Sequence, residues 1–162
     1  MEHDFIAYVD IPMALARGCA STSWCVVNLM IHHWMLAMYD ERAQAEVWGA
    51  DPAALIAAGI AYPQGSAQKT DGGYVISGRW NFCSAAHLSE WSMLAVTVRD
   101  SGQAVDYRMC LLHKSEYEIV DDWQVLGMRS TGSMTIIAKE VFVPEYKALG
   151  MLDARGGNGF PG

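Results

Sequence analysis

The pattern of the chain changes near residue 59, and this change constrains the fold more than any other feature. Before it, residues 12–38 contain a single glycine, Gly18, and apolar side chains recur there at helical spacing. After it, glycines punctuate runs rich in β-branched and aromatic residues, which is typical of strands joined by tight turns. Helices followed by strands predict an α+β fold, with N-terminal helices at one end of a small antiparallel β-barrel or sandwich.

The individual elements follow from the same patterns. We expect helices at residues 12–38 and 41–48, the second capped by Asp40 and ended by Gly49, and a short helical turn through 58 opened by Asp51 and Pro52. The expected strands are 74–77, 91–99, 105–113, 116–120 and 134–143, with the extended run after 73 broken at Gly78. The chain is therefore expected to divide into a partial N-terminal helical region (1–58), a β-domain (59–149) and a flexible tail (150–162).

Composition narrows the classes of protein. A hydrophobic content of 52% with 18% charged residues indicates a folded globular chain. The net charge of −7, with 11 scattered Lys and Arg, argues against a nucleic-acid partner. The apolar run at 25–38 contains two histidines and is too short to span a bilayer, and the acidic start is not a signal peptide. The four cysteines form no CxxC pair, so we expect free thiols, no metal site and a cytoplasmic protein.

Three separated blocks resemble one superfamily of flavoenzymes. They read AYPQGSA (61–67), GGYVISGRWNFCS (72–84, with Trp91 seven residues on) and WQVLGMRSTGS (123–133). In this order they resemble the middle β-domain of the acyl-CoA dehydrogenase superfamily, and within it the two-component flavin-dependent aromatic monooxygenases. The resemblance covers about residues 16–149. It implies that a C-terminal helical bundle and some N-terminal helices are missing, so that the chain is a fragment or a reduced form.

The resemblance also implies a flavin site. Phe82 falls at the position of a ring-stacking aromatic residue, and Ser84 at that of a hydroxyl that meets flavin N5. The loop that contains Ala61, Pro63 and Gly65 corresponds to one whose backbone amides bond the pyrimidine edge, and Arg129 could pair with a phosphate. Alternatively, Phe82 is a core residue, Ser84 an ordinary strand serine and the Arg129 segment a structural turn.

His32 is the candidate that the resemblance places near a phenol. Histidine has the pKa range to polarise or deprotonate a phenolic hydroxyl, and phenolate is the better nucleophile. Successive helical residues point about 100° apart, so only one of His32 and His33 can face that pocket. The alternative is a histidine satisfied in a helix interface.

Three functions follow as expectations. The first is the oxygenase component of an aromatic hydroxylase, in which reduced FMN or FAD from a separate flavin reductase reacts with O2 and a C4a-hydroperoxide attacks a small phenolic substrate. The second is an acyl-CoA dehydrogenase-type oxidoreductase, and the third a non-catalytic, truncated β-domain. The missing bundle would leave apolar surface open, so we expect a homo-oligomer or a marginally stable chain.

Overall fold

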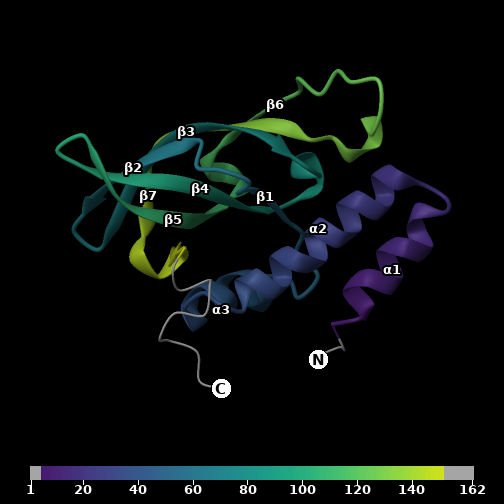
Figure 1. Cartoon of the computed structure of the whole chain (residues 1–162). Helices are drawn as coiled ribbons and strands as arrows, with labels where there is room; N and C mark the ends of the chain where they lie inside the picture. The colour runs from purple at the N-terminus through teal and green to yellow at the C-terminus, as the bar shows by residue number, and fades with distance from the viewer. Residues whose placement is uncertain (1–4, 152–162) are drawn as a thin grey trace.

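Three α-helices lie in the described part of the chain, where the sequence predicts two helices and a short helical turn. The structure, a computed structural model, describes residues 5–151. Helix α1 spans Ala7–Ala16, α2 spans Ala20–Leu36 and α3 spans Glu41–Ala50. The prediction of one helix over 12–38 is wrong, because the chain reverses at 17–19 and Cys19 adopts an extended backbone (φ −153°) before α2. Helices α1 and α2 then lie side by side (Figure 1), and the Ser23 hydroxyl donates to the Pro12 carbonyl at 2.7 Å.

The second expected helix is confirmed, but the third is a strand. The Asp40 side chain caps α3 by accepting from the amide of Arg42 at 2.9 Å, and α3 ends one residue after Gly49. Residues 56–58, expected in a helical turn, instead belong to the fully buried strand β1 (Ile56–Gly59). A short apolar run suits a helix or a strand equally well. Here it forms a strand because it pairs with the edge of strand 91–100.

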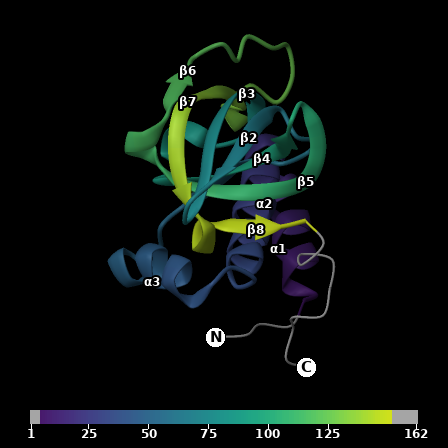
Figure 2. The ribbon, with the colours of Figure 1, turned by 90° about the vertical axis from the view of Figure 1, so that its left-hand side faces the viewer.

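All strands within residues 5–151 belong to one sheet, which confirms the α+β class. They are β1, β2 (Gly65–Thr70), β3 (Gly73–Cys83), β4 (Trp91–Asp100), β5 (Gln103–His113), β6 (Glu118–Val120), β7 (Met134–Pro144) and β8 (Ala148–Gly150). Their order is β6-β7-β3-β2-β4-β5-β8, with β1 also paired to β4, and the sheet is mostly antiparallel and strongly curved (Figures 1 and 2).

The five expected strands are present, and β3 continues through Gly78, where its pairing with β7 shifts register. The expectation missed β1, β2 and β8. Residues 152–162 of the expected tail lie outside the described residues.

Strands β1 and β2 share one edge of β4 with a gap between them. Both run parallel to β4: β1 pairs with its first residues and β2 with residues 96–98. Ala95 of β4 faces this gap, and its carbonyl accepts a hydrogen bond from the buried Trp80 indole at 2.7 Å. A Cβ added to Gly65 or Gly78 would lie 2.2 Å or 2.6 Å from its nearest neighbour, with the Trp80 ring among the contacts in both cases. The two glycines therefore leave the space that the indole fills.

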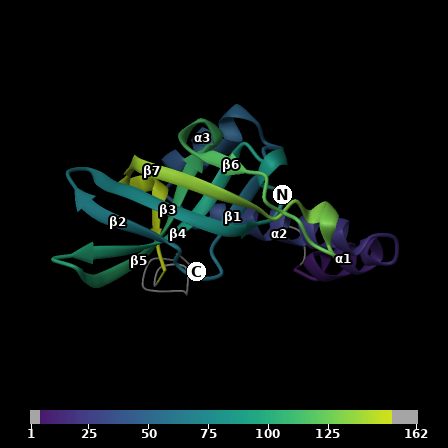
Figure 3. The same ribbon diagram turned by 90° about the horizontal axis from the view of Figure 1, so that it is seen from above.

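Helices α2 and α3 cover one side of the sheet. A second buried cluster lies between them and strands β1, β4 and β5, separate from the core inside the curved sheet. Glu46 of α3 pairs with Lys147 and accepts from the Tyr146 hydroxyl. Helix α2 runs from the loop after β6 at one end to α3 at the other, and α1 extends beyond the strands (Figures 1 and 3). Within residues 5–151, no helix is long and apolar enough to cross a membrane.

Candidate functional site

A bulge near the end of β3 turns Phe82 toward solvent. The pairing of β3 with β7 shifts register between Trp80 and Cys83, and Phe82 has a φ of 65°, which is unusual for a bulky residue. Regular alternation would bury Trp80 and Phe82 on one face. The bulge instead buries Trp80 and Cys83 and leaves Phe82 63% exposed. Its ring meets that of Trp123 edge-on, with 6.1 Å between the centroids.

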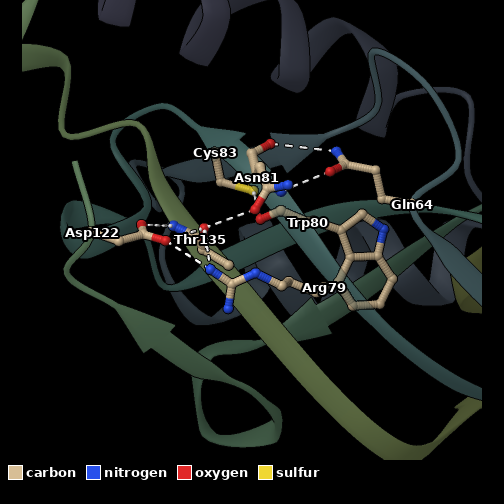
Figure 4. A network of polar contacts seen from close by, with 7 residues as sticks. All are labelled: Gln64, Arg79, Trp80, Asn81, Cys83, Asp122 and Thr135. Carbon is tan, nitrogen blue, oxygen red and sulfur yellow. Dashed lines mark hydrogen bonds and ion pairs between the residues drawn. The ribbon is translucent and has the colours of Figure 1, made fainter. Parts of the chain in front are cut away.

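A polar network fixes this bulge on both sides (Figure 4). The Gln64 side chain accepts from the Asn81 amide at 2.9 Å and donates to the Asn81 carbonyl at 3.4 Å, as a neighbouring strand would. The Thr135 hydroxyl lies 3.0 Å from the Asn81 side-chain oxygen and 2.7 Å from the Asp122 carboxylate. Arg79 pairs with the same carboxylate at 2.8 Å. Because the network joins the loop before β2 to the loop after β6, it holds both loops against the bulge.

Ser84, just after the bulge, belongs to a row of hydroxyl groups. Its oxygen accepts from the Trp24 indole at 3.0 Å and lies 2.8 Å from the Ser133 hydroxyl. The Ser133 hydroxyl lies 2.7 Å from that of Thr131, which donates to the Met128 carbonyl at 2.9 Å. Ser84 is half-buried, whereas Ser133 and Thr131 are buried. A helix, the end of β3 and the loop before β7 thus meet at one serine.

The backbone around Ser84 is concentrated in the left-handed region. Phe82 and Ala85 on one segment, and Met128 and Gly132 on the other, all have φ between 50° and 65°. Such conformations cost free energy in non-glycine residues and cluster at functional sites. At Gly132 a Cβ would lie 2.6 Å from the His87 ring, so this position also needs glycine for space.

Helix α2 joins this region to His32. Besides the bond from Trp24, the Cys25 thiol lies 3.6 Å from the Thr131 carbonyl. His32 lies eight residues beyond Trp24, which is about 12 Å along a helix. In the described part of the chain, no hydrogen bond or ring contact joins His32 to Phe82 or Ser84. The structure therefore places Phe82 and Ser84 close together after the bulge in β3. His32 lies farther along α2, beyond the Trp24 side chain that contacts Ser84.

The two adjacent histidines have different surroundings. His32 is 5% exposed, and its Nδ1 lies 2.6 Å from the Ile56 carbonyl. Because a carbonyl only accepts, Nδ1 carries the hydrogen, and Nε2 of a neutral ring is left as a base. Burial lowers the pKa of His32, which favours this neutral form. His33 instead accepts from the Trp48 indole at 3.0 Å and stacks on that ring.

Of the other predicted residues, three are exposed and Gly65 is partly buried. Ala61 and Pro63 are exposed in the gap between β1 and β2, where the backbone leaves the ladder with β4. Gly65 is the first residue of β2 and pairs with residues of β3 and β4, so its backbone belongs to the sheet. Arg129 is exposed in the short 3-10 helix η3 (Arg129–Thr131).

The sequence did not single out Trp24, Asn81, Asp122 or Ser133 as partners in this region. Only the fold brings them there, because Trp24 lies 60 positions from Ser84 and Ser133 lies 49 positions from it. Gln64 lay inside a predicted loop, but its pairing with Asn81 had no sequence signal.

The residues fit a reduced flavin. Phe82 offers exposed aromatic surface beside the half-buried Trp123 ring. The Ser84 oxygen has a second lone pair beyond the one that Trp24 uses, and the 61–63 backbone lies outside the ladder. Among residues 5–151, no group of three or more His, Cys, Asp or Glu side chains is placed to hold a metal ion.

Comparison with known proteins finds one group of relatives. No model of a protein family matches the chain. The chain is 40% identical over 149 residues to the flavin-dependent monooxygenase oxygenase subunit HsaA of Mycobacterium tuberculosis (strain CDC 1551 / Oshkosh), covering 92% of this chain. It is 38% identical over 157 residues to the oxygenase component of an FADH2-dependent resorcinol hydroxylase of Rhizobium sp., covering 96% of this chain. The chain spans only 38% of the length of each relative.

Solved structures agree. The crystal structure of the M. tuberculosis HsaA monooxygenase matches with a TM-score of 0.83 and 42% identity, over 86% of this chain and 36% of that one. XiaF from Streptomyces sp., solved with FADH2 and glycerol, matches with a TM-score of 0.85 and 29% identity, over 94% of this chain and 40% of that one. By sequence and by fold, the chain is similar to a segment of the oxygenase components of flavin-dependent aromatic monooxygenases, which have the acyl-CoA dehydrogenase-like fold.

Proposed function

We propose that this chain contributes the flavin-binding part of an oxygenase component that hydroxylates a small phenolic substrate. When bound, reduced FMN or FAD supplies the electrons that activate O2. One observation carries the proposal: a half-buried hydroxyl, Ser84, lies two residues after the outward-turned Phe82, between segments held in left-handed backbone conformations. In this role Phe82 supports the ring and Ser84 meets N5.

The surrounding residues support this role. The exposed 61–63 backbone offers amides to the pyrimidine edge, with the Gln64–Asn81 pairing holding that segment against the bulge. Arg129 lies near enough in sequence to Thr131 to reach a phosphate beside the hydroxyl row. Trp123 packs against Phe82 and excludes water from one side of it.

His32 acts as the base toward the phenol. Its Nδ1–H is fixed by the Ile56 carbonyl, so Nε2 keeps a lone pair aimed elsewhere. The lowered pKa of His32 keeps that nitrogen unprotonated at neutral pH. The rise of the helix separates His32 from the Trp24–Ser84 contact by about 12 Å, which leaves room for a ring system between them.

The proposed function also implies partners. A separate flavin reductase supplies the reduced flavin, since the relatives are described as oxygenase subunits or components. We also propose a homo-oligomer, supported by exposed apolar side chains on α1 and α2, among them Val9, Ile11, Met13 and Trp34. The four free cysteines of the described residues fit the cytoplasm.

The test is an anaerobic titration of the chain with dithionite-reduced FMN or FAD, in which the quenching of tryptophan fluorescence reports binding. We expect saturable binding at micromolar flavin, weakened at least tenfold in Phe82→Asp, which places a charge against the ring. Phe142→Asp, at a second exposed phenylalanine on β7, is the matched control and should bind as wild type. Absence of saturable binding to either reduced flavin would overturn the proposal.

A further inference from the structure

The hydroxyl row beside Ser84 can carry its hydrogens in only one direction. Two oxygens 2.9 Å apart need a hydrogen between them, and the Met128 carbonyl has none, so Thr131 must donate to it. The single hydroxyl hydrogen of Thr131 is then used, and Ser133, 2.7 Å away, must donate to Thr131. Ser133 has no second hydrogen, so Ser84, 2.8 Å away, must donate to Ser133.

This order leaves Ser84 as an acceptor only. Its one hydrogen points to Ser133, and one of its two lone pairs accepts from the Trp24 indole, which cannot itself accept. The remaining lone pair is the only hydrogen-bonding capacity that Ser84 can offer to a ligand. A hydroxyl whose hydrogen is held in this way attracts an N–H group and repels a nitrogen lone pair.

We propose that Thr131 and Ser133 are positioning residues that make Ser84 selective for the reduction state of the flavin. Reduced flavin carries a hydrogen on N5, which an acceptor can bind, whereas N5 of oxidised flavin is itself an acceptor. The row therefore favours reduced over oxidised flavin without either residue touching the ring. This inference rests on the proposed function, because it needs Ser84 to face N5.

Burial of the row protects the direction of its hydrogen bonds from competition by water. Thr131 is 1% exposed and Ser133 is 6% exposed, so water cannot easily supply a competing acceptor that would turn the hydroxyls around. The Thr131 amide also donates to the Met128 carbonyl, at 3.2 Å, which holds that acceptor in place. The Met128 carbonyl at the buried end of the row thus fixes the direction of its hydrogens, and Ser84 at the half-buried end presents the resulting lone pair.

The experiment compares the dissociation constants of two forms of FMN by fluorescence quenching. Reduced FMN is measured anaerobically and oxidised FMN aerobically. Thr131→Val keeps the shape and removes the hydroxyl, so Ser133 loses the oxygen to which it donates, and Ser133 and Ser84 can turn their hydrogens toward the flavin. Binding of oxidised FMN should tighten about threefold to tenfold, the worth of one hydrogen bond, while binding of reduced FMN changes little. Ser84→Ala should have the opposite signature: reduced FMN binds about threefold to tenfold more weakly and oxidised FMN is unaffected or tighter.

Two variants separate positioning from general damage. Thr131→Ser restores the donor and should recover the wild-type ratio of the two constants. Ser92→Ala removes another buried serine hydroxyl, bonded to Tyr117 at 2.9 Å, and should leave the ratio unchanged. Thermal melting of each variant confirms that it is folded. If Thr131→Val binds both forms as the wild type does, the inference fails while the proposed function stands. If the wild type binds neither form, the proposed function fails.

Discussion

Replacing His32 tests whether this residue is a base or only a packed ring, because two substitutions separate the roles. His32→Asn keeps an N–H near the position of Nδ1 and can still donate to the Ile56 carbonyl, whereas His32→Ala cannot. A buried carbonyl left without a partner costs about 1–3 kcal/mol. We therefore expect His32→Ala to be less stable than His32→Asn by that amount. At about 2–4 °C per kcal/mol, its melting temperature should be roughly 2–12 °C lower.

Hydroxylation should respond differently from stability. Neither variant keeps Nε2, so both should hydroxylate a phenol about 10²- to 10⁴-fold more slowly, the usual contribution of a general base. The assay is chromatography of hydroxylated product with reduced flavin supplied, in the protein that carries this chain. His33→Asn, at the neighbouring histidine that accepts from Trp48, is the control and should keep its rate. Wild-type hydroxylation by His32→Asn would refute the base and leave His32 as a packing residue.

Three further predictions concern stability. Burial lowers the pKa of His32 from its ordinary value of 6.5, so unfolding takes up a proton below about pH 6.5. The free energy of unfolding should therefore fall more steeply between pH 6.5 and 5 in the wild type than in His32→Asn. Parallel curves in urea titrations of the two proteins would contradict this. Gly65→Ala places a Cβ 2.2 Å from the Trp80 ring and should cost about 1–3 kcal/mol, whereas Gly49→Ala, with open space around it, should stabilise α3 by about 0.5–1 kcal/mol; thermal melting with the opposite order would refute the packing argument. Asp122→Ala removes the acceptor for a buried threonine amide and hydroxyl and should cost about 1–3 kcal/mol in chemical unfolding, and no loss would show that the network around the bulge is unimportant.

The sequence was informative where local signals agree with tertiary structure. Long strands such as β4 and β7, and the Asp40 cap of α3, follow from residue type and spacing alone. The break at 17–19 was missed because apolar spacing continues across it, and only the packing of α1 on α2 reveals the reversal. Strand β1 was missed because its partner in β4 lies 35 positions later (Ile56 pairs with Trp91) and its own run suits a helix equally well.

The candidate site divides in the same way. The pairing of Phe82 and Ser84 in one surface region followed from their closeness in sequence and from the family resemblance. The outward turn of Phe82 depends on a bulge in the pairing of β3 with β7, a strand that lies far from it in sequence. The direction of the hydroxyl row depends on Trp24, Ser133 and the Met128 carbonyl, which only the folded chain brings to Ser84.

The most direct test of the account is a crystal structure of the chain soaked anaerobically with reduced FMN. We expect the ring to lie against Phe82 with N5 about 3 Å from the Ser84 oxygen, the distance of an N–H···O hydrogen bond. A ring bound elsewhere, or with N5 turned away from Ser84, would contradict it.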